Sequence, residues 1–490
     1  MAPCGAKLAA LLVTRRRYEV GNIRIAHAAH AARWAAFEKN GGRVSGDLTD
    51  CSPGRASGRG TARGIHDGPG IGLRCVRAAA AALLALAGQP AIAAEPAFAA
   101  QPDLPNGFSP FATVGYQYDT NVFMRPSGSS PLASQGITGL GDSILNYQAG
   151  LSETVGAGPQ HLSLEADATR DQYDRFSFLN HYDYNFSGLL DWRLGPVVDG
   201  MASYRQSRFM ADFINTFSTA LLIDTARSGS VTVRILITPA WRLDLSPGLN
   251  ELDTPLTAYP DFKTVDKIGV ASLNYLGFGK LTAGLQFTDD SGRYEGITAA
   301  TRYQQHEVDL TANYKVSGLS SFGASVGYTR RSSAPNPADS VPAPGGGLLA
   351  YGNLGETSSA TGALTYERKL TGKTSMNLAL FRRVDSYSAG ANPEVGTGGS
   401  VGASWNVDPK IIVDLNYGLT KEQVQGGLVV VNVPNLSQRQ QNAQFELRYK
   451  VIPWLTLRPY VNWTKETSTF TLSNYSGTIV GIDLTARPPP

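Results

Sequence analysis

From about residue 109 to its end, the chain is a succession of segments in which apolar and polar residues alternate one by one. The segment NAQFELRYKV at 442–451 has an apolar residue at every second position, and IIVDLNYGLT (411–420) and YDYNFSGLLDWR (182–193) largely repeat the pattern. Successive side chains of a β-strand point to opposite faces, so a period of two separates two environments. The sequence therefore predicts strands with one apolar and one polar face.

The connectors between these segments alternate between longer and shorter stretches. We place about 18 strands, with bounds uncertain by about two to four residues, at 109–123, 142–155, 160–175, 181–194, 198–210, 223–237, 241–252, 264–276, 279–291, 301–315, 320–332, 355–369, 374–386, 396–407, 410–423, 437–451, 453–467 and 474–487. Longer links such as 124–141 and 333–354 follow odd strands, and tight links such as 156–159 and 408–409 follow even strands. Bacterial outer-membrane barrels have short periplasmic turns and longer extracellular loops.

These features predict an all-β fold, a single antiparallel up-and-down transmembrane β-barrel of about 16–18 strands. Lipid offers no hydrogen-bond partner, so among β structures only a closed barrel spans a membrane. The alternative is a soluble β-sandwich with one wet face. Sandwich strands usually run about 5–6 residues, whereas these segments are nearer ten, which favours the barrel.

The region before the strands has the composition of an export leader. Arg74 and Arg77 precede the apolar run 78–88, and A-x-A sites follow at 91–93 and 97–99. Such a run is too short for a membrane-spanning helix and is typical of a secretory signal. We predict an N-terminal extension at 1–70, a signal peptide at 71–93, a periplasmic lead-in at 94–108 and the barrel at 109–490. The extension is either disordered or the product of a mis-assigned start, and we expect the mature protein to begin near Ala94 or Ala100.

Charge and cysteine content narrow the function classes. Residues 1–77 hold 13 Lys/Arg and 5 Asp/Glu, which leaves 30 and 35 for the rest of the chain. The barrel region is thus mildly acidic and lacks the basic patch that phosphate-backbone binding needs, so we expect no nucleic-acid partner. All three cysteines, Cys4, Cys51 and Cys75, precede residue 78. We therefore expect no zinc, iron–sulfur or cysteine-nucleophile chemistry in the mature chain.

Aromatic residues fall near both ends of the predicted strands, where interfacial girdles belong. We expect the periplasmic girdle to include Trp192, Trp241, Tyr314, Tyr449 and Trp454. We expect the outer girdle to include Tyr118, Phe123, Tyr182, Tyr303 and Tyr328.

Two short motifs carry a family resemblance. The segment YQYDTNVF at 116–123 resembles the "Y-D-D-N-hydrophobic" opening of outer-membrane β-barrels found in exopolysaccharide gene clusters, the type 2 β-barrel porin family, with Thr120 in place of the second acidic residue. The pattern Arg-x-x-Tyr-x-Arg-Phe at 170–176 is similar to a later segment of the same family. The resemblance implies an integral protein of the Gram-negative outer membrane that assists polysaccharide secretion or assembly. It brings no catalytic residues.

The sequence offers little that points to catalysis. Three histidines, His161, His181 and His306, lie in the predicted barrel, and no serine–histidine–acid set is evident. Asp289 to Gly292 with Glu295 lie in an expected outer loop and have the oxygen ligands that calcium prefers, without the spacing of a known loop motif. We expect no enzyme activity, no metal and no cofactor.

The polar face of the strands is the candidate functional surface. We expect these charged residues to face the lumen: Glu165, Asp167, Asp183, Asp191, Arg193, Arg234, Glu307, Asp309, Glu367, Lys369, Arg383, Asp414, Glu446, Arg448, Lys450, Arg458 and Asp483. Either these charges pair with one another and stabilise the barrel wall, or they form a hydrophilic pore lining. The Pro/Gly-rich link 333–354 either folds inward as a constriction or remains an outer loop.

The leading hypothesis is a channel or assembly component for exopolysaccharide export. Its expected partners are outer-membrane lipid, the polysaccharide, polysaccharide-export proteins and the barrel-assembly machinery. The alternatives are a general diffusion porin, a non-conducting surface receptor or adhesin, and an outer-membrane hydrolase.

Overall fold

The computed structural model describes residues 107–488, except 131, 133–137, 212, 214–218, 255–261, 278, 296–299, 336–340, 343–347, 350–355, 388–391, 425–436 and 470–473. The predicted extension, the signal peptide and nearly all of the lead-in lie outside the described residues, as does the expected mature start.

Eighteen long strands form one sheet within the described residues. They are β1 (Gly107–Asp119), β2 (Asp142–Ala157), β3 (Gln160–Tyr173), β4 (His181–Leu194), β5 (Val198–Met210), β6 (Ile223–Thr238), β7 (Trp241–Thr254), β8 (Phe262–Tyr275), β9 (Leu281–Glu295), β10 (Ala300–Ser317), β11 (Ser320–Pro335), β14 (Glu356–Lys369), β15 (Thr374–Tyr387), β16 (Asn392–Asp408), β17 (Ile411–Val424), β18 (Ser437–Ile452), β19 (Leu455–Ser468) and β20 (Tyr475–Ala486). A 3₁₀ helix, η4 (Ser177–Leu179), follows β3, and the two-residue strands β12 (Val341–Pro342) and β13 (Leu348–Leu349) pair with each other.

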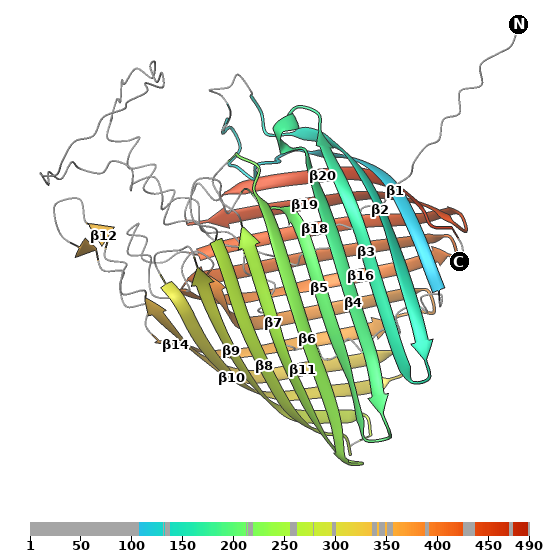
Figure 1. Ribbon diagram of the computed structural model, residues 1–490, viewed down its shortest axis with the longest axis vertical. Helices are drawn as coiled ribbons and strands as arrows, with labels where there is room; N and C mark the ends of the chain where they lie inside the picture. The colour runs from blue at the N-terminus through green and yellow to red at the C-terminus, as the bar shows by residue number, and fades with distance from the viewer. Residues whose placement is uncertain are drawn as a thin grey trace, which may run out of the picture.

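Each long strand pairs antiparallel with the next, and the last pairs with the first (Figure 1). The closing ladder between β1 and β20 runs from Ala112 opposite Ala486 to Asp119 opposite Ile479. The sheet therefore has no free edge, and the predicted antiparallel barrel of about 18 strands is confirmed.

Tight turns join the strands at one end of the barrel. The links β2–β3, β4–β5, β6–β7, β8–β9, β10–β11, β14–β15, β16–β17 and β18–β19 have two to five residues. Gly158 and Gly195 lie in two of them with φ of 63° and 70°, a left-handed conformation that glycine adopts without a steric penalty. At the other end, β9–β10 and β15–β16 are joined by only four residues, because β9 and β16 extend beyond their predicted bounds.

The two faces of the sheet differ as the alternation predicts. On β10, Val308 and Leu310 are 47% and 61% exposed, whereas Glu307 and Asp309 on the opposite face are 4% and 0% exposed. An apolar outer face and a polar inner face are the signature of a barrel in lipid. No helix in the described part of the chain is long and apolar enough to cross a membrane.

Aromatic rings on the inner wall cover glycines of the neighbouring strand. Tyr303 lies opposite Gly292, and Tyr460 lies opposite Gly481. A Cβ added at either glycine would collide with the facing ring. The missing side chain lets the ring lie flat along the wall, an arrangement that also fixes strand register.

Candidate functional site: the inner wall and outer mouth

All seventeen charged residues assigned to the lumen from sequence lie on the face of their strands that carries the buried polar residues. The strand register gives this directly, since each pairs across the ladder with another inward position, as Asp414 does with Glu446 and Arg458 with Asp483. Seven of the seventeen form arginine–carboxylate ion pairs with other inward residues, namely Arg234, Arg383, Asp414, Glu446, Arg448, Arg458 and Asp483, and Asp183 lies 3.3 Å from His181. In contrast, Asp191, Glu367, Lys369 and Lys450 form no ion pair within the described residues. Their role as a pore lining stays a prediction.

Five of these residues form a continuous ladder of ion pairs across β17–β20. Arg448 contacts Asp414 and, at 3.3 Å, Glu446. Arg458 joins Glu446 at 3.1 Å and Asp483 on the last strand. The Asp483 side chain is only 1% exposed. Positive and negative groups alternate along the wall here, so their charges largely cancel locally.

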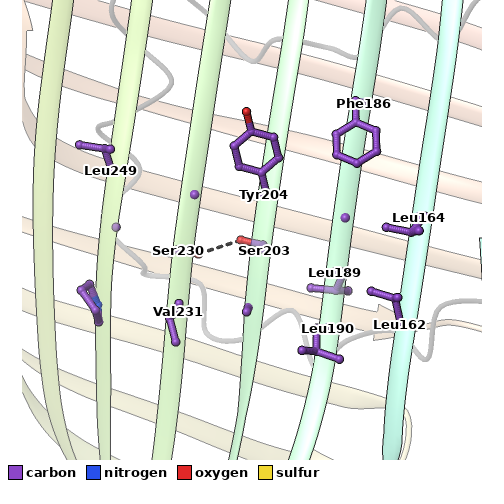
Figure 2. A pocket seen from close by; sticks show the side chains of 15 residues that line it. Leu162, Leu164, Phe186, Leu189, Leu190, Ser203, Tyr204, Ser230, Val231 and Leu249 are labelled. Carbon is purple, nitrogen blue, oxygen red and sulfur yellow. Dashed lines mark hydrogen bonds between the residues drawn. The ribbon is translucent and has the colours of Figure 1, made fainter. Parts of the chain in front are cut away.

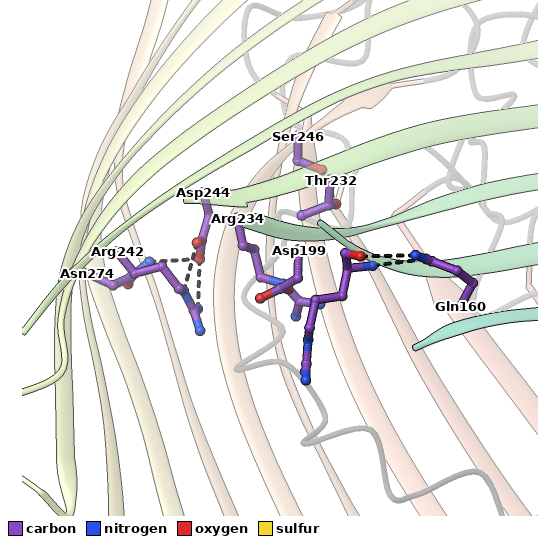
Figure 3. Close-up of polar contacts among 9 residues, drawn as sticks. Gln160, Asp199, Thr232, Arg234, Arg242, Asp244, Ser246 and Asn274 are labelled. Carbon is purple, nitrogen blue, oxygen red and sulfur yellow. Dashed lines mark hydrogen bonds and ion pairs between the residues drawn. The ribbon is translucent and has the colours of Figure 1, made fainter. Parts of the chain in front are cut away.

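A second group of polar contacts lines the inner side of β5–β8 (Figure 3). Arg234 Nε lies 2.6 Å from Asp199 Oδ1. Arg242 makes two hydrogen bonds of 2.7 Å to Asp244, which also accepts a 2.9 Å bond from Asn274. This wall too is lined by side chains that pair with their neighbours and keep polar atoms toward the interior.

The outer ends of β15 and β16 lie against the inner side of the neighbouring wall. The β14–β15 ladder stops at Gly362 opposite Arg382, although both strands continue further outward. Val384 and Val395, paired on the nominally outer face, are 6% and 4% exposed. Gln305 of β10 donates a 3.4 Å hydrogen bond to the Val384 carbonyl, although β11 and β14 separate the two strands in the sheet. These strand ends therefore overlap the inside of the barrel near its mouth.

Acidic residues gather where this overlap covers the wall. Tyr303 donates to Asp266 at 3.0 Å and to Asp290 at 3.1 Å, and the Arg331 guanidinium lies 3.7 Å from the centre of the Tyr303 ring. Other inward acids in this region include Asp385, Glu394 and Glu422. Five of the acids, Asp266, Asp290, Asp385, Glu394 and Glu422, are absent from the set predicted from sequence. Their position in the alternation was the signal that would have found them.

Three outer connections on the other side of the mouth pack into a small apolar core, which we call the loop cap. It contains Val122, Phe123, Leu132, Ile144, Tyr173, Phe176, Leu179 and Phe213. The Phe123 ring meets Phe176 at 4.8 Å and Phe213 at 4.9 Å, both edge to face. The cap thus joins the β1–β2, β3–β4 and β5–β6 connections into one packed unit over β1–β5.

Both motifs behind the family resemblance meet in this cap. In the first, Asn121 Nδ2 donates to the carbonyls of Arg125 (2.8 Å) and Ser476 (3.0 Å), which ties the loop to β20 at the closure of the barrel. In the second, the backbone amides of Arg175 and Phe176 donate to the Asp142 carboxylate at 3.0 and 2.9 Å. Burial in the cap lowers the pKa of Arg125 to about 10, which leaves it protonated at neutral pH.

Two of the expected girdle residues face elsewhere. Tyr118, Tyr182 and Tyr328 are 45–57% exposed on the outer face, as a girdle requires. Phe123 is fully buried in the cap because β1 ends at Asp119 and the chain has already turned over the mouth. Tyr303 is 6% exposed because its odd position on β10 places it inward, where its hydroxyl binds carboxylates.

The segment 289–292, which was expected to lie in an outer loop and whose oxygen ligands suit calcium, is part of a strand. Residues 289–292 belong to β9, where Asp289 and Asp290 point to opposite faces. Asp289 lies 2.9 Å from His306 on the outer face, and Asp290 binds Tyr303 on the inner face. The two carboxylates therefore do not converge on one ion. The link 333–354 lies mostly outside the described residues, so its predicted inward fold stays a prediction.

A shallow hollow of about 670 Å³ lies on the outer surface across β3–β7 (Figure 2). Its lining is mainly apolar and includes Leu164, Phe186, Tyr204 and Val231. Phe186, Tyr204 and Val231 are 40–44% exposed on the outward face. The hollow therefore belongs to the surface that lipid chains cover, and it has no set of converging polar groups of the kind a solute site uses.

One cluster near the cap has the residue types of a metal site. His181 Nε2 lies 3.6 Å from Asp171 and 3.3 Å from Asp183, and the three ligand atoms lie within 4.8 Å of one another. His181 Nδ1 faces the Leu179 carbonyl at 2.7 Å. No serine hydroxyl joins His181 or His306 in the hydrogen bonds described, so neither belongs to a serine–histidine–acid triad there.

A closed antiparallel barrel with an apolar outer face, a polar inner face and short turns at one end defines a transmembrane β-barrel of the outer-membrane type. No family model and no curated protein matches the chain. Solved structures with a similar fold include OpdK of Pseudomonas aeruginosa with vanillate, at 13% identity and a TM-score of 0.41 over 78% of this chain and 99% of that one.

Two others are a copper transporter, OprC, and a ferric enterobactin receptor, PfeA, of Pseudomonas aeruginosa in a mutant form. OprC has 10% identity and a TM-score of 0.42 over 74% of this chain and 63% of its own. PfeA has 10% identity and a TM-score of 0.42 over 78% and 81%. Likenesses at this level show the fold and carry no information about what this chain does.

Proposed function

We propose that the barrel is a hydrophilic conduit of the outer membrane that serves exopolysaccharide export, without catalysis. One observation carries the proposal: many charges of the inner wall form ion pairs along the wall, as in the Asp414–Arg448–Glu446–Arg458–Asp483 ladder. Such a surface offers many hydrogen-bond donors and acceptors with little uncompensated charge. A hydroxyl-rich, weakly charged polymer needs these partners and would be slowed by strong charge traps.

The two family-like motifs support the same proposal, since both are placed in the cap that covers part of the outer mouth. The partners proposed with it are the polymer, polysaccharide-export proteins on the periplasmic side and the barrel-assembly machinery. The seventeen inward charges are proposed as the lining of the path.

A diffusion channel for small solutes is the second candidate. The overlapping ends of β15 and β16 narrow the barrel, and the acidic side chains Asp266, Asp290 and Glu394 lie at this narrowing. This observation favours a diffusion channel. Acidic groups at a constriction attract cations, so such a channel prefers cationic over anionic solutes.

Two measurements separate the candidates. Purified barrel in planar bilayers is exposed to neutral oligosaccharides and, separately, to salts with small cations or anions. The export proposal expects current blockades by the oligosaccharides, and loss of secreted polymer on gene deletion with small-solute uptake intact. Cation selectivity without sugar blockades, together with normal polymer secretion, favours the diffusion channel. A barrel that conducts nothing would overturn both and leave a receptor or structural role.

A further inference from the structure

Beneath the loop cap, the outer ends of β3 and β4 bring one histidine and two aspartates together on the inward face of the sheet. The side chains of His181 and Asp171 are 3% and 1% exposed, and that of Asp183 is 18% exposed. We propose that His181, Asp171 and Asp183 bind a divalent transition-metal ion of the zinc type, which anchors the β3–β4 connection under the cap. This inference is independent of what the barrel transports.

The orientation of the imidazole is the first argument. His181 Nδ1 lies 2.7 Å from the Leu179 carbonyl, which only an N–H can satisfy. In the neutral ring with its proton on Nδ1, Nε2 carries a lone pair, and this nitrogen faces two carboxylates. A histidine that donates one ring N–H to a backbone carbonyl and presents the other nitrogen to a metal is a common arrangement at metal sites.

The distances are the second argument. Zinc binds imidazole nitrogen and carboxylate oxygen at about 2.0–2.1 Å with tetrahedral angles, which sets ligand atoms about 3.3–3.4 Å apart. His181 Nε2 lies 3.3 Å from Asp183 Oδ1 and 3.6 Å from Asp171 Oδ2. Three protein ligands leave a fourth position for water. A nitrogen ligand beside two carboxylates favours a transition metal over calcium or magnesium, which prefer oxygen alone.

Charge is the third argument. Two carboxylates and a neutral imidazole bring a formal charge of −2 to a site that is almost closed to water, and a charged group is more favourably buried beside an opposite charge. A divalent ion matches the formal charge of these three side chains. Asp183 Oδ1 is buried and, in the described part of the chain, accepts no hydrogen bond beyond its approach to His181.

Metal at this position would brace the cap. Leu179, whose carbonyl fixes the His181 ring, is a fully buried member of the loop cap, and Tyr173 of the cap lies 6.2 Å from the imidazole, ring centre to ring centre. The ion would therefore join β3 and β4 where the connection 174–180 leaves the sheet. The bound state is expected to protect that connection from proteolysis.

The test uses the full barrel, refolded in detergent and freed of metal with a chelator. Cobalt(II) is titrated with visible spectroscopy, and zinc(II) by competition with a chromogenic chelator. The wild type is expected to bind one equivalent of each, with slower proteolysis at 174–180. His181→Ala and the nearly isosteric Asp183→Asn are expected to weaken binding on the order of a hundredfold. The matched control is His306→Ala, which removes a histidine that lies 2.9 Å from Asp289 but is 45% exposed on the outer face.

Heat-modifiable migration on a gel establishes that each variant is folded. Absence of binding by the folded wild type would overturn the proposal and leave His181 as a protonated partner of the two aspartates. Equal affinity in folded His181→Ala or Asp183→Asn, or an equal loss in His306→Ala, would also overturn it, because the metal would then bind elsewhere.

Discussion

At the scale of single residues, Arg458 joins the ion-pair ladder of β18 to Asp483 on the last strand, next to the closure of the barrel. Its guanidinium contacts Glu446 on one side and the almost fully buried Asp483 on the other. Asp483 also lies over Gly115 of β1, where an added Cβ would collide with its carboxylate. The same arginine therefore compensates charges on β18 and on the last strand, beside the first.

We expect Arg458→Met to destabilise the barrel by about 3 kcal/mol, because the buried Asp483 carboxylate loses the arginine that pairs with it. Urea unfolding followed by tryptophan fluorescence measures the loss. Lys450→Met is the matched control, since Lys450 is an inward cation without an ion pair in the described residues and should change stability little. Equal effects of the two substitutions would mean that the ladder adds nothing beyond general lumen charge.

Residue-level prediction from sequence succeeds where the alternation alone decides and fails where packing decides. The period of two assigns Glu446 and Arg458 to the inner face without any structure. It also places Tyr303 inward, although its aromatic character suggested a girdle. Phe123 was beyond this kind of reasoning, because it lies in an irregular connection whose partners, Phe176 and Phe213, are distant in sequence.

At the scale of elements, the phase of each strand is the sharpest claim. On β18, Phe445 is 39% exposed on the outer face, and Glu446 binds arginines on the inner face. A slip of one residue would exchange the two faces.

Cysteine labelling checks this phase, since the barrel region has no cysteine of its own. We expect Phe445→Cys to react with a lipid-soluble maleimide and Glu446→Cys with a water-soluble one. The reverse pattern in folded protein would show that the faces are misassigned.

Substitution of Leu310 tests the position of the apolar belt of outward residues that faces lipid, which we call the band. Leu310 lies near the middle of β10 and is 61% exposed on the outer face. Leu310→Arg should cost about 2–4 kcal/mol, the penalty for a cation near the bilayer midplane. Folding titrations into lipid vesicles measure it, with Leu310→Ala as the control for lost side-chain volume. A cost no larger than that of alanine would place Leu310 outside the band.

The strands were predictable because each must satisfy one rule, polar inward and apolar outward, over its whole length. The strand bounds were less predictable. For example, β16 was expected to begin at residue 396, whereas it begins at Asn392. Beyond the lipid, both faces of a strand contact polar surroundings, so the alternation that marks its bounds weakens. Contacts between loops, such as Asn121 with the Ser476 carbonyl, have no periodic signal at all.

At the scale of the whole molecule, the outer ends of β15 and β16 narrow the barrel near its mouth. The link 333–354, predicted to be either an inward constriction or an outer loop, lies mostly outside the described residues. The hydrogen bond from Gln305 to the Val384 carbonyl holds the overlap of β15 and β16 against the wall. Val384 and Val395 are buried by it. The overlap breaks the β14–β15 ladder outward of Gly362, so the strand ends are attached to that wall by side-chain contacts and not by a ladder.

Loss of one contact that holds this overlap should favour an open arrangement, and conductance reports the opening. A single hydrogen bond contributes about 1 kcal/mol, so Gln305→Ala should shift the equilibrium about fivefold toward the open arrangement. Planar-bilayer recordings should then show more frequent or longer high-conductance states. Gln304→Ala, on the exposed outer face one residue away, is the control and should leave the records unchanged. If instead deletion of 336–347 raises conductance while Gln305→Ala does not, the constriction lies in the link that the sequence indicated, and β15–β16 are a fixed part of the wall.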